Sequence, residues 1–86
     1  MGARKINNNL NIIAKNLRKY REEKDFSQTD ICRELALIGI TMYINDIYRI
    51  EYGKRTVKDY ELYAFCKVLG ISYEQLFDGA DEFFKF

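Results

Sequence analysis

The chain has 86 residues, 48% of them apolar, and a formal net charge of +1, which allows one small domain with a hydrophobic core and excludes a uniformly basic or acidic protein. It lacks histidine and a Gly-rich phosphate loop, and its two cysteines, Cys32 and Cys66, match no zinc spacing, so we expect neither an enzyme nor a bound metal or other cofactor. No apolar run could span a membrane and no secretory signal is recognisable, which leads us to expect a cytoplasmic protein.

The first predicted element is a helix over residues 9–24. Apolar residues recur in it with helical spacing, and Lys, Arg and Glu occupy most of the other positions. The recurring residues are Ile13, Leu17 and Tyr20. Asp25 can adopt a turn conformation and should end the helix, and residues 1–8 before the helix are expected to form a flexible N-terminal arm.

The second predicted helix begins after Ser27, a favoured N-cap residue. Asp30 lies three residues further on and completes the pattern of a capping box, in which two side chains satisfy free backbone N–H groups. The helix should end before Gly39.

The third predicted helix spans residues 40–51, with Thr41 as its N-cap. Ile47 and Ile50 are three residues apart and should both face the core. Gly53 is a natural terminator and is expected to follow the end of this helix.

Two more helices are predicted after a loop. The fourth covers about residues 58–69, and Gly70 should end it. A short fifth helix starts at Ser72, and Gln75 completes a second capping-box pattern. Residues 78–86 form an acidic, aromatic C-terminal tail. The sequence therefore predicts an all-α protein, a compact bundle of about five short helices.

Charged residues are segregated along the chain. Residues 1–24 carry seven Lys or Arg and two Glu, and residues 49–58 carry four Lys or Arg and one Glu, whereas residues 25–48 and 59–86 are acidic. If the two basic segments meet in space, they form a positive face suited to nucleic acid. Ordinary solvated helix charges would explain the pattern equally well.

Three segments together resemble the Cro/phage-repressor-like helix-turn-helix family of the xenobiotic-response-element type. They are IAKNLRKYREEKDFSQTDIC, IYRIEYGKR and DYELYAFCKVLGISYEQLF, in this order and at compatible spacings. The resemblance implies a lambda-repressor-like DNA-binding domain over residues 9–77, in which the second and third helices form the helix-turn-helix. The turn LALIGI before the third helix is longer than in the shortest phage repressors, which leaves the start of that helix open by a residue or two.

The resemblance implies that the outer face of the third helix contacts base edges in the major groove of DNA. Asn45 matches the hydrogen-bonding groups of adenine and Arg49 those of guanine, while Tyr48 suits a methyl group or a phosphate. Ile44 fits a thymine methyl group and a core position equally well. Tyr43 fits either the edge of the core or the DNA backbone.

The resemblance also predicts contacts to the DNA backbone. Gln28 lies at the start of the second helix, where free N–H groups and the helix dipole suit a phosphate. Lys54 and Arg55 lie in a loop that follows the sugar-phosphate backbone in similar sequences, and they would supply salt-dependent affinity for any sequence. Tyr52 would add a hydroxyl donor to the same strand.

Two charged residues are predicted to be structural. In similar sequences an Arg late in the first helix pairs with the Glu that ends the third helix, and Arg21 and Glu51 occupy these positions. Cys32 and Cys66 lie where similar sequences often carry Ala, and we expect them to be compact buried apolar residues.

The leading hypothesis is a small sequence-specific transcriptional regulator, expected to be a repressor, that binds double-stranded DNA. A homodimer would bind a palindromic operator whose half-sites are about one helical turn apart, ~34 Å. The alternative is a protein-interaction module on the same scaffold, such as an anti-repressor or an antitoxin with a toxin as its partner. The near-neutral charge and the acidic second half of the chain favour this alternative.

Overall fold

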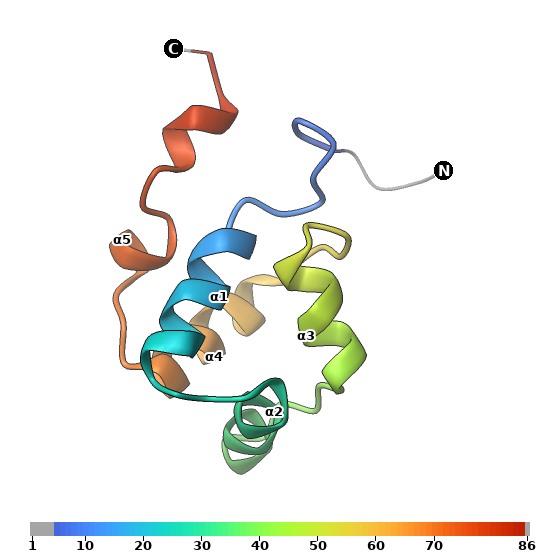
Figure 1. Cartoon of the computed structure of the whole chain (residues 1–86), viewed down its shortest axis with the longest axis vertical. Helices are drawn as coiled ribbons and strands as arrows, with labels where there is room; N and C mark the ends of the chain where they lie inside the picture. Colours follow the sequence, from blue (N-terminus) through green and yellow to red (C-terminus); the bar gives the residue numbers. More distant parts are fainter. Residues whose placement is uncertain (1–4, 86) are drawn as a thin grey trace.

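The computed structural model describes residues 5–85, and within this range the only strand-type pairing is one isolated β-bridge between Ile6 and Asn9. This architecture confirms the all-α prediction. None of the helices in residues 5–85 is long and apolar enough to cross a membrane. The elements are α1 (Ala14–Glu23), α2 (Gln28–Leu37), α3 (Ile44–Glu51), α4 (Asp59–Leu69), α5 (Tyr73–Leu76) and a 3-10 turn, η1 (Ala80–Phe83) (Figure 1).

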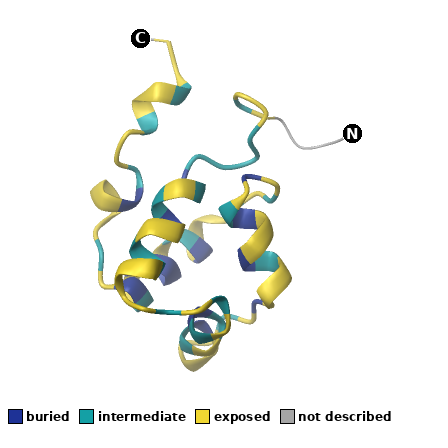
Figure 2. Ribbon diagram, in the orientation of Figure 1, coloured by how far each residue is buried: buried dark blue, intermediate teal, exposed yellow. Residues whose placement is uncertain are grey.

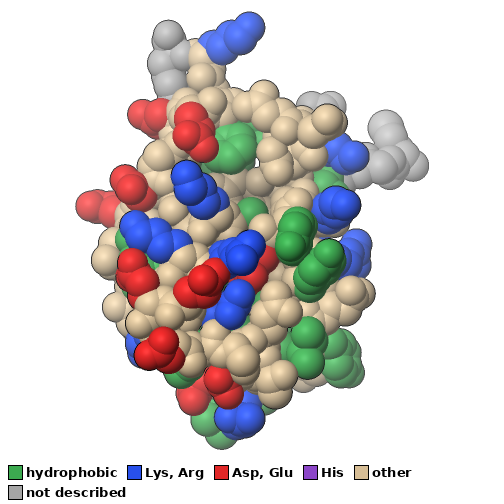
Figure 3. All heavy atoms as spheres, viewed as in Figure 1, with side chains coloured by type: hydrophobic (Ala, Val, Ile, Leu, Met, Phe, Trp, Pro, Cys, Tyr) green, Lys and Arg blue, Asp and Glu red, His purple; other side chains and the backbone are tan. Residues whose placement is uncertain are grey.

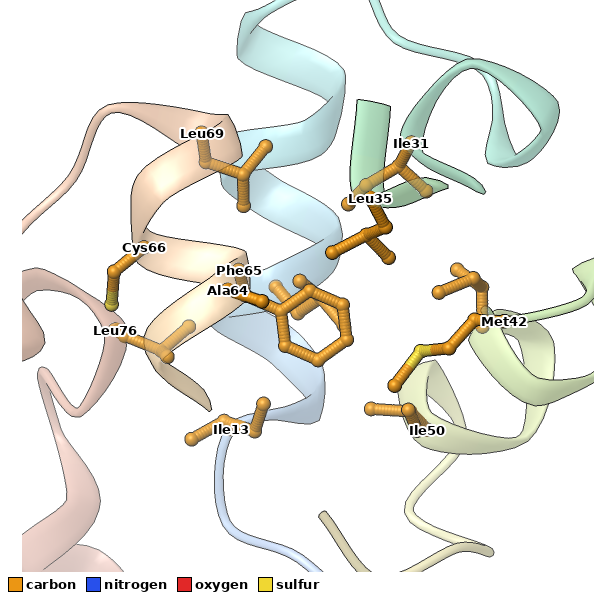
Figure 4. Close-up of a cluster of buried hydrophobic side chains, with 12 residues drawn as sticks. Ile13, Ile31, Leu35, Met42, Ile50, Ala64, Phe65, Cys66, Leu69 and Leu76 are labelled. Atoms are coloured by element: carbon orange, nitrogen blue, oxygen red, sulfur yellow. The ribbon is translucent and has the colours of Figure 1, made fainter. Parts of the chain in front are cut away.

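The helices enclose one hydrophobic core. α1 packs against α3, α4 and α5, while α2 packs against α3 and α4. Phe65 of α4 lies near the middle of the buried cluster, with Leu35 of α2 and Ile50 of α3 on one side of it (Figure 4). The core therefore fixes the position of α3 through its packing against two other helices, α1 and α2.

The cap residues predicted from the sequence set the limits of three helices. Ser27 Oγ accepts a hydrogen bond from the Asp30 N–H at 3.0 Å, and the Asp30 carboxylate accepts one from the Ser27 N–H at 2.8 Å. The Ser72 hydroxyl and the Gln75 side chain cap α5 in the same reciprocal way. Gly70 ends α4 with a φ of +65°. These boundaries confirm the predictions for α2, α4 and α5.

The prediction of a helix start at residue 9 is wrong, because α1 begins at Ala14. Asn7 and Asn8 adopt left-handed φ angles of 47° and 65°, and residues 6–9 form a tight turn. The Asn11 side chain then accepts a hydrogen bond from the Ile13 N–H at 3.0 Å. Asparagine side chains compete with the helical ladder for backbone groups, and here they keep the chain in a loop.

α3 begins at Ile44, four residues later than predicted, and Thr41 does not cap it. Gly39 follows α2 with a φ of 90°, and Met42, which is only 5% exposed, is buried in the turn between the two helices. Tyr43 is the N-cap residue, and its N–H donates to the Asp46 carboxylate at 3.0 Å. A side chain from inside the helix thus performs the capping that Thr41 was expected to perform.

Asn16 of α1 forms two hydrogen bonds to the C-terminal segment. Asn16 Nδ2 donates to the backbone oxygens of Leu76 at 2.9 Å and Asp78 at 2.8 Å. The predicted tail, residues 78–86, thus includes the short turn η1. Phe86 and residues 1–4 of the predicted arm lie outside the described residues.

Candidate nucleic-acid interface

One side of α3 faces the core and the other faces solvent. Ile47 and Ile50 are fully buried, as predicted, whereas the residues on the opposite side are exposed (Figure 2). Ile44 is 50% exposed and Tyr43 is 71% exposed, so the core position considered for each of them is wrong. The exposed residues at the start and along the outer side of α3 are Tyr43, Ile44, Asn45, Tyr48 and Arg49.

Both acidic residues of α3 point away from this exposed side. The Asp46 carboxylate accepts the Tyr43 N–H and pairs with Arg55 Nε at 3.4 Å. Glu51 accepts two hydrogen bonds from Arg21, at 2.6 and 3.0 Å. The exposed side of α3 therefore carries the amide of Asn45, the guanidinium of Arg49 and apolar side chains. Both carboxylates of the helix are engaged in ion pairs.

The Arg21–Glu51 ion pair is present, as predicted, and it is largely buried. The side chains are 11% and 2% exposed, and Arg21 also donates to the Phe26 backbone oxygen at 2.8 Å. The hydrogen bond to Glu51 raises the pKa of the Arg21 guanidinium despite its burial. Gln28 Nε2 donates to the same Glu51 carboxylate at 3.3 Å. This cluster joins the end of α1, the start of α2 and the end of α3.

Arg55 makes a second set of contacts, with carboxylates of α3 and α4. Its guanidinium donates to both oxygens of Glu61 at 3.0 Å and approaches Asp46. Burial alone would raise the pKa of Glu61, which is 4% exposed, but hydrogen bonds from Arg55 and from the Lys58 N–H outweigh that effect and lower it. The structure thus gives Arg55 a role in joining α3 to α4 that the sequence did not reveal.

The loop after α3 is held by the segment that precedes α1. The Leu10 N–H donates to the Gly53 backbone oxygen at 2.8 Å, and Asn11 Nδ2 donates to the backbone oxygens of Ile50 and Arg55, both at 3.0 Å. Gly53 has a φ of 71°, and a Cβ atom there would collide with the Asn9 side chain. These contacts fix the loop that carries Lys54, whose side chain is exposed.

Two tyrosines extend the exposed side of α3 towards this loop. The rings of Tyr48 and Tyr52 pack with centroids 4.6 Å apart and an interplanar angle of 34°. Both are about half exposed. The contact restricts both rings, and Tyr52 is the C-cap residue at which α3 passes into the loop.

A family model for the Cro/C1-type HTH DNA-binding domain matches residues 16–82, most of the chain. The chain belongs to this family. It is therefore a DNA-binding protein rather than an enzyme, with α2 and α3 as its helix-turn-helix, and the resemblance of the three sequence segments is confirmed. Comparisons with curated proteins and with solved structures gave no match.

The exposed charge of this Cro/C1-type domain is smaller than its basic segments suggested. The segments do meet, because α1 packs against α3, but Arg18, Arg21 and Arg55 are each paired with a glutamate. Arg49 and Lys54 are exposed and form no ion pair within residues 5–85. Basic and acidic side chains alternate over α1 in Figure 3, whereas hydrophobic side chains gather over α3.

Asn11 was not recognised from the sequence, and its role in the Cro/C1-type domain can be tested against Asn16. Each amide joins two distant backbone oxygens, Asn11 beside the loop after α3 and Asn16 at the C-terminal segment. Replacing either by Ala should lower the free energy of unfolding by about 1–3 kcal/mol, because each variant leaves at least one partly buried backbone oxygen without this donor. Urea titrations would measure this change.

Only Asn11→Ala should also weaken DNA binding, when both variants are compared under conditions in which they are folded. The loop that carries Lys54 would lose its support in that variant alone. Equal DNA affinities of Asn11→Ala and Asn16→Ala would show that the segment before α1 does not position the loop.

Proposed function

We propose that this protein is a sequence-specific regulator of transcription that recognises double-stranded DNA in the major groove through α3. The supporting observation is the outward placement of Asn45 and Arg49 on a helix whose inner side is fixed by two buried isoleucines. The amide of Asn45 suits adenine N6 and N7, and the guanidinium of Arg49 suits guanine O6 and N7. These two residues would therefore specify the sequence.

The proposed backbone contacts surround this helix. Lys54, in the loop after α3, would bind a phosphate through its free ammonium group, and Tyr52 would add a hydroxyl donor. Gln28 is the first residue of α2 and would contact a phosphate at the N-terminus of this helix. Its side-chain amide would keep its hydrogen bond to Glu51. Arg55 would contribute chiefly by holding the loop, because its guanidinium is already engaged with Glu61 and Asp46.

A single α3 is too short to specify an operator alone. Its eight residues correspond to about 12 Å of helix, so it can reach only a few base pairs. We therefore propose a homodimer on a palindromic operator, with half-sites about 34 Å apart. A bound dimer would block access of RNA polymerase to the same DNA, which makes repression the proposed outcome.

Selection from a random duplex pool would test the proposal and supply a binding site for variant measurements. Asn45→Ala and Arg49→Ala should each weaken binding to the selected site by about 1–3 kcal/mol and leave random duplex nearly unaffected. Lys54→Ala should weaken binding to both DNAs and reduce the salt slope by about one. Fluorescence anisotropy at several salt concentrations measures both effects.

A pool without an enriched sequence, together with a flat salt response, would contradict the proposal. That result would favour the protein-interaction module, with a toxin or another protein as partner, for which the family match gives no support.

A further inference from the structure

The outer side of α3 is unusually apolar for a surface that binds a polyanion. Tyr43 is 71% exposed, Ile44 50% and Tyr48 47%, and all three belong to α3 or its N-cap. Single exposed apolar residues are common on proteins, but a contiguous group of them marks a contact surface. Figure 3 shows hydrophobic side chains gathered over this helix.

The charges around this apolar group favour DNA as its partner. Asp46 and Glu51 are both turned into ion pairs, and the exposed charged groups of α3 and the following loop are the cations Arg49 and Lys54. An apolar surface bordered by cations and free of exposed carboxylates is complementary to a groove between two phosphate strands. This step rests on the proposed function, in which α3 occupies the major groove.

The base edges in the major groove offer one apolar group, the C5 methyl of thymine. We propose that the start of α3 recognises thymine methyl groups, so that the half-site is rich in A·T pairs opposite Tyr43, Ile44 and Tyr48. Ile44 is the first residue of α3, and the N-terminal residues of a recognition helix are those that contact base edges. Asn45, beside it, suits adenine and agrees with the same composition.

Deoxyuridine provides the probe, because it lacks only the methyl group of thymidine and keeps its hydrogen-bonding groups. The DNA would be the duplex selected from a random pool, with each thymidine of one half-site replaced in turn by deoxyuridine. At the positions that α3 contacts, each replacement should reduce affinity about fourfold, the effect of exposing one methyl-sized group. Replacements elsewhere in the duplex should have no effect.

Variants assign the effect to the apolar residues. In Ile44→Ala, the ratio of affinities for the thymidine and deoxyuridine duplexes should fall to about one at the position that Ile44 contacts. Tyr73→Ala is the matched control, because Tyr73 is 48% exposed and lies on α5, which packs on α1 and α4. This control should keep the wild-type ratio even if it alters affinity. Circular dichroism would confirm that both variants are folded.

The possible failures are distinguishable. Clear selection of a sequence with no loss at any deoxyuridine position would overturn the methyl contact and leave the proposed function in place. A deoxyuridine effect that persists unchanged in Ile44→Ala, Tyr43→Ala and Tyr48→Ala would also overturn it. If no sequence is selected from the pool, the proposed function fails, and the inference fails with it.

Discussion

Replacing Arg21 by Met is expected to lower the free energy of unfolding by about 3–5 kcal/mol, because removal of one partner of a buried ion pair leaves an uncompensated charge. The carboxylate left behind belongs to Glu51, whose side chain is 2% exposed. Gln28 Nε2, at 3.3 Å, would be its remaining side-chain donor. Small domains have only about 5–15 kcal/mol of stability, so the loss should be obvious in thermal or urea unfolding.

Two further variants make this test specific. Arg18 pairs with Glu22 on the same helix, but these side chains are 57% and 55% exposed, so Arg18→Met should change stability by no more than about 1 kcal/mol. The double variant Arg21→Met/Glu51→Leu should recover most of the lost stability, because neither charge stays buried alone. If Arg21→Met were as stable as the wild type, the Arg21–Glu51 pair would not hold α1 to α3.

Local signals in the sequence predicted most of the helix boundaries. Ser27 with Asp30 marks the start of α2, Ser72 with Gln75 marks the start of α5, and Gly70 ends α4. Each signal works within four residues, because a cap satisfies backbone groups of its own first or last turn. Boundaries set by such caps are therefore visible without knowledge of the fold.

The boundaries that were wrong depend on other contacts. The segment before α1 is held by Asn11, which reaches the backbone of Ile50 and Arg55, 39 and 44 residues away. The start of α3 depends on Met42 being buried in the core, after which Asp46 caps the helix from within its first turn. A sequence considered in short windows does not show that the core buries Met42 or that Asn11 reaches Ile50 and Arg55.

The sequence predicted the part of the interface that depends on helical periodicity, but not the part that depends on contacts between distant segments. The alternation of buried Ile47 with exposed Asn45 and Arg49 follows from helical periodicity and appears in the structure. The engagement of Arg55 with Glu61 and Asp46 does not follow from periodicity, because it requires the loop and α4 to be placed first. Charge counts along the sequence therefore overstated the number of cations free to meet DNA.

The second large effect is expected at Ile47, which is fully buried on the inner side of α3. Ile47→Ala should lower the free energy of unfolding by about 2–5 kcal/mol, because it removes buried methyl groups and leaves a cavity in a close-packed core. Ile44 is the matched control, being the same residue type three positions earlier on the same helix but 50% exposed. Ile44→Ala should change stability by about 1 kcal/mol or less.

The two substitutions should affect DNA binding in the reverse order: the one that lowers stability most, Ile47→Ala, should weaken binding least. Ile47→Ala does not change the outer surface of α3, so at a temperature where it is folded it should bind the selected duplex nearly as well as the wild type. Ile44→Ala should stay folded and bind that duplex less well. Thermal unfolding combined with anisotropy titrations would measure both properties for each variant. If the stability losses were equal, or if the DNA defect followed Ile47 instead of Ile44, α3 would not present to DNA the face that is exposed in this structure.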